Sequence, residues 1–241
     1  MKIIIVGCGS IGFSHLKSFI YSKKSYQIDI VEEKNIKKKI KKLNIKSSIK
    51  LKIYKNVPIK NNYDFAIFAT NSKERLALLK DFLKNNNKFK YLLLEKFVFP
   101  KKKDFINFES YFKKYIKKIY VNSIAGYIYK KLALKKLKIK KIKMLIYTKN
   151  GTFFTNLIHY LDLYYQLTST KAALEEAKIK KIFNSKRYGY KEAIGSLKFI
   201  SKNGTLEINS HRKIDLKILI NSKENRFKII LKKNYLFFYK N

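Results

Sequence analysis

Two short groups of polar side chains in this sequence are of types that can move protons. Glu95 and Lys96 come directly after the apolar run Tyr91–Leu94. Lys96 could donate a hydrogen bond or a proton to a substrate oxygen while Glu95 holds it in place. The alternative is an ordinary ion pair on the surface.

The second group lies in an apolar stretch that is predicted to be a helix, Phe153–Leu167. Asn156, His159 and Asp162 follow one another there at intervals of three residues, which places them on adjoining parts of one helix face. His159 has apolar neighbours, so its imidazole would be partly desolvated and suited to accept a proton near neutral pH. The alternative is a histidine that is satisfied within the core.

A glycine-rich motif lies near the amino terminus. Gly7, Gly9 and Gly12 have G-x-G-x-x-G spacing, after the apolar run Ile3–Val6 and before a helix predicted over residues 11–22. In this setting the first glycine permits a tight turn, the second lets the backbone approach a pyrophosphate, and the third lets the helix pack on the strand. The helix N-terminus favours the anion. The alternative is a Rossmann-like domain whose glycines serve packing alone. The residues predicted to bind the dinucleotide here are Gly7, Gly9, Ser10, Ile11 and Gly12.

An acidic residue follows at the distance that such a site requires. The next predicted strand ends in Glu32, twenty positions after Gly12. A carboxylate there would accept the hydroxyls of an adenosine ribose and repel a 2′-phosphate, which favours NAD over NADP. Lys34 lies close by, so NADP stays an alternative.

The elements that must position these groups fall into two halves. Up to about residue 121, continuous apolar strands alternate with amphipathic helices, which implies a parallel sheet covered on both faces. From residue 122 to 241 we predict a smaller α+β domain with a mainly antiparallel sheet, including a hairpin at Asn203 and Gly204 and a helical stretch near Lys130–Leu137. The fold class is therefore α/β with a second, α+β domain. Strands are predicted at 3–6, 28–31, 51–54, 65–70, 91–94, 119–122, 142–147, 197–199, 206–208, 216–220, 227–231 and 235–239.

The formal net charge of +40 bears on possible partners. Only four of the 56 basic residues are arginine, and the lysines are scattered through every segment together with abundant isoleucine and asparagine. Nucleic-acid surfaces favour arginine for bidentate contacts, so an AT-rich coding sequence explains the lysines better than a specific nucleic-acid partner does. A protein that binds polyanions through its charge is the alternative. The charge should also attract anionic ligands such as dinucleotides.

Other features of the composition exclude several classes of protein. The single cysteine excludes an internal disulfide framework and a cysteine zinc cluster, and no metal site is predicted. No segment approaches the roughly 18–20 apolar residues of a membrane span. The amino-terminal apolar run is too short for a signal peptide, and we expect a cytoplasmic protein without membrane insertion.

The motifs together resemble one family. Their order is that of the Gfo/Idh/MocA oxidoreductases, which include glucose–fructose oxidoreductase and inositol dehydrogenase, and the branch found beside surface-polysaccharide genes is most similar. The resemblance implies an NAD(P)-binding Rossmann domain over residues 1–121 and a shortened α+β domain for substrate and oligomerisation over 122–241. A homo-oligomer would form through the second sheet. The residues that carry the resemblance are Gly7, Gly9, Gly12 and His15; Phe68, Ala69, Thr70 and Asn71; Glu95 and Lys96; Gly151, Asn156, His159 and Asp162; and, for the branch, Arg187, Gly189, Tyr190 and Glu192.

The resemblance also implies roles. Lys96 matches the lysine that orients or protonates the reacting sugar oxygen, and His159 matches the histidine that takes up the hydroxyl proton while hydride moves to the nicotinamide. Thr70 and Asn71 match the turn that passes along the cofactor, and Glu95 matches the acid of the same motif as Lys96. Asn156 is expected to bind the sugar. The implied activity is NAD(P)-dependent hydride transfer to or from a sugar or nucleotide sugar in polysaccharide metabolism.

Several positions depart from the family pattern. Phe97 replaces the usual proline, Arg75 replaces a frequent histidine, and Asn156 stands where a carboxylate is common and cannot exchange a proton at neutral pH. A catalytically degenerate member that still binds NAD is one alternative. A regulatory nucleotide-sensing module, which would need neither Lys96 nor His159, is another.

Overall fold

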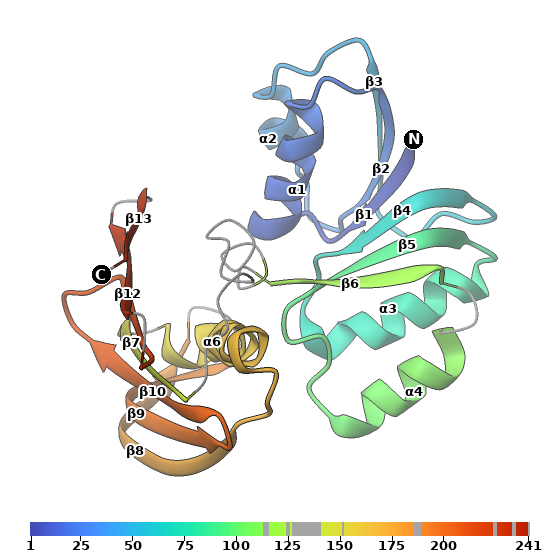
Figure 1. Cartoon of the computed structure of the whole chain (residues 1–241). Coiled ribbons are helices and arrows are strands. Elements are labelled where there is room, and N and C mark those ends of the chain that lie inside the picture. Colours follow the sequence, from blue (N-terminus) through green and yellow to red (C-terminus); the bar gives the residue numbers. More distant parts are fainter. Residues whose placement is uncertain are drawn as a thin grey trace. The chain divides into compact units, whose positions relative to one another are not determined.

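The computed structural model describes residues 1–112, 116–123, 126, 141–150, 152–185, 189–223, 226–232 and 235–240. The chain divides into two compact units, Met1–Asn122 and Ser123–Asn241 (Figure 1). The helical stretch predicted near Lys130–Leu137, together with Gly151 and Arg187, lies outside the described residues. Among the described residues, no helix is both long enough and apolar enough to cross a bilayer.

The first unit contains a parallel sheet of six strands in the order β3-β2-β1-β4-β5-β6. This confirms the predicted parallel sheet. Figure 1 shows α1 and α2 on one face of it and α3 and α4 on the other. The strands are β1 (Lys2–Val6), β2 (Tyr26–Val31), β3 (Ile49–Tyr54), β4 (Asn62–Phe68), β5 (Lys88–Glu95) and β6 (Lys118–Asn122), and the helices are α1 (Ser10–Ile20), α2 (Lys37–Lys41), α3 (Ser72–Lys84) and α4 (Lys102–Phe112).

Burial on both faces explains why the strands read as continuous apolar runs. Along β1, Ile3 and Ile5 join the core that lies under α1 and α2. Ile4 and Val6, which point to the opposite face, join the core that lies under α3 and α4. Apolar residues of the helices on each face pack against the strands and complete that core. The alternation of strands and helices in the sequence therefore produces a sheet that is buried on both faces.

The strand order reverses at β1. β1 pairs with β2 on one side and with β4 on the other, and the helices that follow β1 and β4 lie on opposite faces of the sheet. The loops after these two strands therefore diverge at the carboxyl edge, which is where open α/β sheets bind their ligands. The glycine motif follows β1 at this edge, and Thr70 follows β4.

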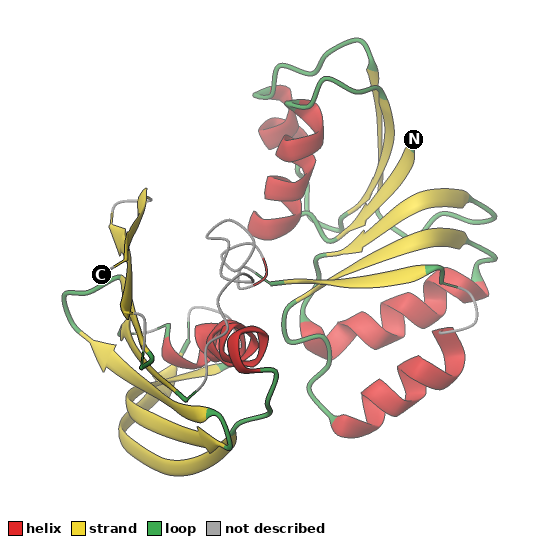
Figure 2. Cartoon of the chain, in the orientation of Figure 1, coloured by secondary structure: helices red, strands yellow, loops and turns green. Residues whose placement is uncertain are grey.

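The second unit contains a mixed sheet of seven strands in the order β13-β12-β11-β7-β10-β9-β8. All of its pairs are antiparallel except β7 with β10, which confirms the mainly antiparallel sheet. The helix α6 (Phe153–Thr168) covers one face (Figure 2) and packs on a core from β7, β9, β10, β11 and β12. The strands are β7 (Ile142–Lys149), β8 (Ala173–Asn184), β9 (Lys191–Ser201), β10 (Gly204–His211), β11 (Leu216–Asn221), β12 (Arg226–Lys232) and β13 (Tyr235–Lys240).

The hairpin predicted at Asn203 and Gly204 joins β9 to β10. Gly204 has a φ of +139°, and a Cβ there would lie 1.9 Å from the carbonyl oxygen of Ile142 in the neighbouring strand. The glycine thus serves both the turn and the close approach of β7.

Candidate functional site

The glycine loop after β1 has three different glycine environments. Gly7 has a φ of +84°, in the region that favours glycine, and it makes the turn out of the strand. A Cβ on Gly12 would lie 2.0 Å from the carbonyl oxygen of Gly7, so only glycine lets α1 pack on the loop. A Cβ on Gly9 would meet no atom of the described residues within 4 Å. Packing therefore accounts for Gly7 and Gly12 and leaves Gly9 unexplained.

Gly9 is also the N-cap of α1. It has no side-chain cap among the described residues, and the first intrahelical bond runs from Phe13 N–H to the Gly9 carbonyl. The N–H groups of Ser10, Ile11 and Gly12 thus belong to the first helical turn, whose N–H groups have no intrahelical acceptor. Together with the space over Gly9 that no described residue fills, this is an arrangement that can receive a phosphate.

Glu32 connects the end of β2 to the glycine loop. Its Oε2 accepts the Cys8 N–H at 2.7 Å, and its Oε1 accepts the Lys34 N–H at 3.2 Å. Each carboxylate oxygen can accept more than one hydrogen bond, so Glu32 keeps capacity for ribose hydroxyls. The half-buried carboxylate is held beside the glycine loop.

The Cys8 thiol lies under this loop and is 1% exposed. Burial, reinforced by the nearby charge of Glu32, raises its pKa to about 11. The Cys8 thiol is therefore neutral and buried at physiological pH, which disfavours nucleophilic chemistry.

Thr70 lies against the glycine loop from the neighbouring strand. A Cβ on Gly7 would come within 2.8 Å of the Thr70 Cγ2. The Thr70 hydroxyl oxygen is buried and has no hydrogen-bond partner in the part of the chain that the structure describes, and a buried hydroxyl of this kind calls for a ligand or a water. Asn71 follows as the exposed N-cap of α3.

Glu95 ends β5 at the same edge and is buried, with 9% exposure. Its Oε1 accepts hydrogen bonds from His15 Nε2 at 2.8 Å and from Asn122 Nδ2 at 2.9 Å. Burial alone would raise the pKa of Glu95, but these two hydrogen bonds, together with the nearby charges of His15 and Arg75, outweigh it, and the pKa is lowered. The carboxylate is thus held ionised by two groups whose part in the site the sequence did not reveal.

Arg75 was missed as a functional residue by sequence reasoning. It is 1% exposed, and its guanidinium donates to the carbonyl oxygens of Glu95 at 2.8 Å, Phe97 at 3.0 Å and Val98 at 2.9 Å, and also to the Thr70 carbonyl. It thereby joins the loops after β4 and β5 and holds the backbone on both sides of the half-buried Lys96. The available signal was that arginine is rare in a chain so rich in lysine.

Phe97 explains part of this loop geometry. Its φ is +53°, which a proline ring, with φ near −65°, cannot adopt. A proline could therefore not occupy position 97 in this backbone conformation, and Arg75 holds the carbonyl groups on either side of Lys96 in this loop.

In the second unit, α6 presents His159 and Asp162 beside Ser123. The Ser123 hydroxyl donates to Asp162 Oδ2 at 2.5 Å, and Ser123 Oγ lies 3.4 Å from His159 Nδ1. Gln166 Nε2 donates to the other oxygen of Asp162 at 3.1 Å. His159 and Asn156 are both half-buried on this helix. Sequence analysis did not identify Ser123, which follows β6 and belongs to no recognisable motif.

Glu192 holds the beginning of α6. It is 1% exposed, and its two oxygens accept the N–H groups of Phe154 at 2.9 Å and Thr155 at 3.0 Å, as well as the Thr155 hydroxyl. A buried carboxylate at a helix N-terminus satisfies N–H groups that lack intrahelical acceptors and complements the helix dipole. Glu192 therefore positions the helix that carries Asn156 and His159.

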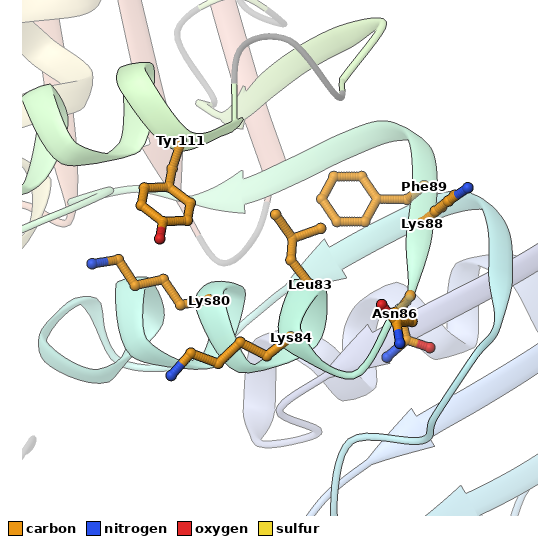
Figure 3. Close-up of a pocket in the computed structure, with 8 residues that line it drawn as sticks. Lys80, Leu83, Lys84, Asn86, Lys88, Phe89 and Tyr111 are labelled. Atoms are coloured by element: carbon orange, nitrogen blue, oxygen red, sulfur yellow. The ribbon is translucent and has the colours of Figure 1, made fainter.

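A pocket of about 410 Å³ occurs elsewhere in the first unit (Figure 3). It is lined in part by Lys88 and Phe89 at the start of β5, whereas Glu95 ends the same strand, so the pocket lies at the opposite edge of the sheet from the glycine loop. Among the described residues, no three side chains of histidine, cysteine, aspartate or glutamate are grouped as a metal site.

The predicted site residues are thus distributed over both units. The first unit holds Gly7, Gly9, Ser10, Ile11, Gly12, Glu32, Thr70, Asn71, Glu95 and Lys96 along the carboxyl edge of its sheet, and the second unit holds Asn156 and His159 on α6.

Comparison with known proteins gives a match in structure only. No family model matches the sequence, and no curated protein matches it. The WlbA dehydrogenase of Bordetella pertussis, in complex with NADH and UDP-GlcNAcA, is similar with a TM-score of 0.69 at 12% identity, over 98% of this chain and 81% of that chain.

Two further solved structures agree with this. The UDP-N-acetylglucosamine 3-dehydrogenase GnnA of Acidithiobacillus ferrooxidans matches with a TM-score of 0.62 at 12% identity, over 100% of this chain and 81% of that one. A Gfo/Idh/MocA family oxidoreductase of Vibrio cholerae matches with a TM-score of 0.60 at 10% identity, over 100% and 82%. The chain therefore has the fold of the Gfo/Idh/MocA oxidoreductases, in agreement with the resemblance that its ordered motifs carry.

Proposed function

We propose that this protein is an NAD(P)-dependent oxidoreductase that transfers hydride between a nicotinamide and a hydroxyl or carbonyl carbon of a sugar or nucleotide sugar. The observation that carries the proposal is Gly9. It faces space that none of the described residues fills, at the first turn of α1 on the carboxyl edge where the strand order reverses. Two of the structural neighbours are enzymes of nucleotide sugars, and one was solved with NADH. A cytoplasmic role in surface-polysaccharide metabolism belongs to the same proposal.

The residues along this edge fit a dinucleotide. The first-turn N–H groups of α1 would hold the diphosphate, and Glu32 would accept ribose hydroxyls, which favours NAD over NADP. The unpaired hydroxyl of Thr70 would donate a hydrogen bond to the bound cofactor. The nicotinamide, when bound, supplies the acceptor or donor of hydride.

The chain's own side chains would manage the proton. In oxidation, His159 accepts the proton of the substrate hydroxyl, and Lys96 donates a hydrogen bond to the same oxygen. Asn156 would hydrogen-bond a further sugar hydroxyl. Arg75 keeps the Lys96 backbone in place through the carbonyl groups of Glu95 and Phe97.

A homo-oligomer through the second sheet is part of the proposal. The edge strand β8 exposes Leu174, Ile179 and Ile182, with 56%, 37% and 61% exposure. A long edge strand with exposed apolar side chains favours association. We propose no specific nucleic-acid partner, because the lysines are spread over every segment of the chain.

The proposal is tested by NADH binding to the purified protein, followed by fluorescence or calorimetry at moderate salt. We expect saturable binding that Gly9→Val abolishes. Because a Cβ at Gly9 meets no atom of the described residues, this variant should stay folded, although valine is a poorer N-cap than glycine and should lower the unfolding temperature by a few degrees. Gly126→Ala, whose added Cβ makes an ordinary 3.6 Å contact with Gln166 among the described residues, is the matched control and should bind normally.

Turnover is then screened with nucleotide sugars. Lys96→Ala should bind NADH and lose turnover. Absence of NADH binding to the parent protein would contradict the proposal. Binding without turnover of any sugar would favour the catalytically degenerate or nucleotide-sensing alternative.

A further inference from the structure

We propose that the pocket lined by α3, α4 and the start of β5 binds a small organic anion, a carboxylate attached to a flat apolar body (Figure 3). This site is separate from the glycine loop, and it does not depend on the function proposed above. Its volume of about 410 Å³ falls within the range of small-molecule sites, which is about 300–1,000 Å³.

Apolar side chains form one part of the lining. Phe89 is 5% exposed and Leu83 is half-buried, and Figure 3 shows Leu83 between the rings of Phe89 and Tyr111. The Tyr111 ring is 58% exposed. A flat ligand that packs against Tyr111 and Leu83 would remove this apolar surface from water, which favours its binding.

Lysine side chains supply the charge of the pocket. Lys80 and Lys84 are four positions apart on α3 and extend to the same side in Figure 3, and Lys88 begins β5. Like charges at this spacing on a helix repel each other. Within the described part of the chain, none of these three lysines forms an ion pair with a carboxylate, and none of the eight lining residues is acidic. A bound anion would therefore relieve the repulsion, whereas a bound cation would increase it.

The charge and the apolar surface are adjacent. Lys80 Nζ lies 5.4 Å from the centroid of the Tyr111 ring. A ligand whose body packs on the ring can thus place its carboxylate beside Lys80 and Lys84 without leaving the apolar part of the lining. This arrangement selects an anion that carries an apolar body over a bare inorganic anion or an uncharged apolar molecule.

The turn between α3 and β5 holds the lining in place. Asn87 is 2% exposed; its Nδ2 donates to the carbonyl oxygens of Pro58 at 2.6 Å and Phe82 at 3.1 Å, and its Oδ1 accepts the Asn61 N–H at 2.9 Å. The Phe89 ring packs on Phe82 with 5.4 Å between centroids. The pocket is therefore formed before a ligand binds, which lowers the entropic cost of binding.

The pocket and the glycine loop lie at opposite edges of the sheet. Phe89 and Glu95 are six residues apart on β5, a separation of about 20 Å along a strand. A ligand of the size of the pocket cannot span this distance. Binding in the pocket should therefore be independent of any dinucleotide at the glycine loop.

The test is titration of the full-length protein with naphthoate, followed by the fluorescence of the naphthalene ring. The chain has no tryptophan, so the protein contributes little background. We expect saturable binding of one naphthoate per chain. The uncharged naphthylmethanol should bind at least about 5-fold more weakly, because it loses the interaction with the lysines. Acetate, which has the carboxylate without the apolar body, should not displace naphthoate at equal concentration.

Variants place the ligand in this pocket. Lys80→Gln combined with Lys84→Gln should weaken naphthoate binding by about 3-fold to 30-fold. Lys202→Gln combined with Lys213→Gln removes the same charge from exposed positions of the second unit and is the matched control, which should bind like the parent. Tyr111→Ala should weaken binding by about 10-fold, whereas Tyr111→Phe keeps the ring and should bind normally. Because these side chains are exposed or half-buried, all of the variants should keep the urea unfolding midpoint close to that of the parent.

Gly9→Val separates this site from the dinucleotide site. It should bind naphthoate like the parent, and loss of binding there would place the anion at the glycine loop and overturn the proposal. Absence of naphthoate binding, equal affinity for naphthylmethanol, or equal weakening in the two double lysine variants would also overturn it. Naphthoate binding that depends on Lys80 and Lys84 in a protein that does not bind NADH would support the pocket and contradict only the function proposed above.

Discussion

Two buried charged side chains organise the edge of the first sheet at the scale of single residues. Arg75 satisfies carbonyl oxygens of two loops at once, and Glu95 is held ionised by His15 and Asn122. Burying a charge without partners is costly, whereas a charge surrounded by hydrogen bonds makes its surroundings rigid. The loop that carries Lys96 is therefore held by hydrogen bonds to its backbone, which no pattern of side chains in the sequence displays.

Glu32 is the residue expected to decide between the two nicotinamide cofactors. Glu32→Ala should weaken NADH binding by about 10-fold or more, because each lost hydrogen bond to a charged group is worth roughly 1.5–3 kcal/mol. NADPH binding should change less, since the repulsion of the 2′-phosphate is also removed. Parallel titrations of both cofactors measure this, and equal losses would remove Glu32 from the ribose site.

The Cys8 thiol should be nearly inert in the folded protein. Its pKa is raised from 9.0 to about 11, so the thiolate fraction at pH 8 falls by about 100-fold relative to an ordinary cysteine. A thiol reagent should therefore react at least about 100-fold more slowly with the native protein than with the protein unfolded in denaturant. Comparable rates in the two states would show that the loop opens readily.

The raised pKa of Cys8 also makes the stability of the folded protein depend on pH. Because the pKa of Cys8 is higher in the folded state than in the unfolded state, burial of the neutral thiol contributes fully to the free energy of unfolding below pH 9. This contribution is lost as the pH rises from about 9 to about 11. Cys8→Ser should lessen the loss of stability over this range, as measured by denaturant unfolding at several pH values.

At the scale of elements, α6 depends on a residue from a distant strand. Glu192 lies at the beginning of β9, 37 or 38 positions along the chain from the N–H groups that it accepts. The helix begins where this carboxylate meets it, so the position of His159 depends on a strand as well as on the apolar pattern of the helix.

Glu192→Ala should destabilise the protein by about 2–3 kcal/mol, because it leaves buried N–H groups at the start of α6 without an acceptor. Glu192→Gln keeps one acceptor oxygen and should cost about half as much. Urea unfolding measures both. Glu207→Gln, which removes only a partly exposed ion pair with Lys143 at 3.8 Å, is the control and should change stability by less than about 0.5 kcal/mol. Equal effects of the three variants would contradict the capping role.

Comparison of the predicted strands with the observed ones shows which strands an apolar pattern can locate. Strands buried on one or both faces were found, with ends right within a few residues in β1, β2 and β11, whereas β9 begins at Lys191, six positions before its predicted start. The 12-residue β8 was not located, because almost all of its side chains are exposed and it therefore carries no apolar alternation. The strand predicted to reach Thr70 ends at Phe68, and Arg75 takes the Thr70 carbonyl.

At the scale of the whole molecule, the net charge of +40 opposes folding through self-repulsion. The described ion pairs are few and mostly exposed, such as Lys90 with Asp64 and Lys198 with Glu175. Pairs of this kind contribute little to stability. Repulsion among the excess lysines therefore lowers the stability of both units.

Stability should consequently rise with salt. Raising NaCl from about 0.02 M to about 0.2 M shortens the screening length to below about 10 Å, which weakens repulsion between lysines more than it weakens the few close pairs. The midpoint of urea unfolding should therefore move to a higher urea concentration. A series with a neutral osmolyte at constant ionic strength is the control, because it stabilises proteins through exclusion from their surface without screening charges. A decrease with salt would show that specific ion pairs outweigh the repulsion.

The sequence by itself determined the order of the elements with buried faces, the parallel and antiparallel halves, and the motif residues, because buried faces and tight turns restrict which residue types can follow one another locally. Only the tertiary structure decided which groups hold those motifs. Arg75, Ser123 and Glu192 act through hydrogen bonds to backbone or side chains that are five to 39 positions away. Such partners meet because strands and helices pack in three dimensions, and a one-dimensional pattern records neither their distance nor the direction of a proton between them.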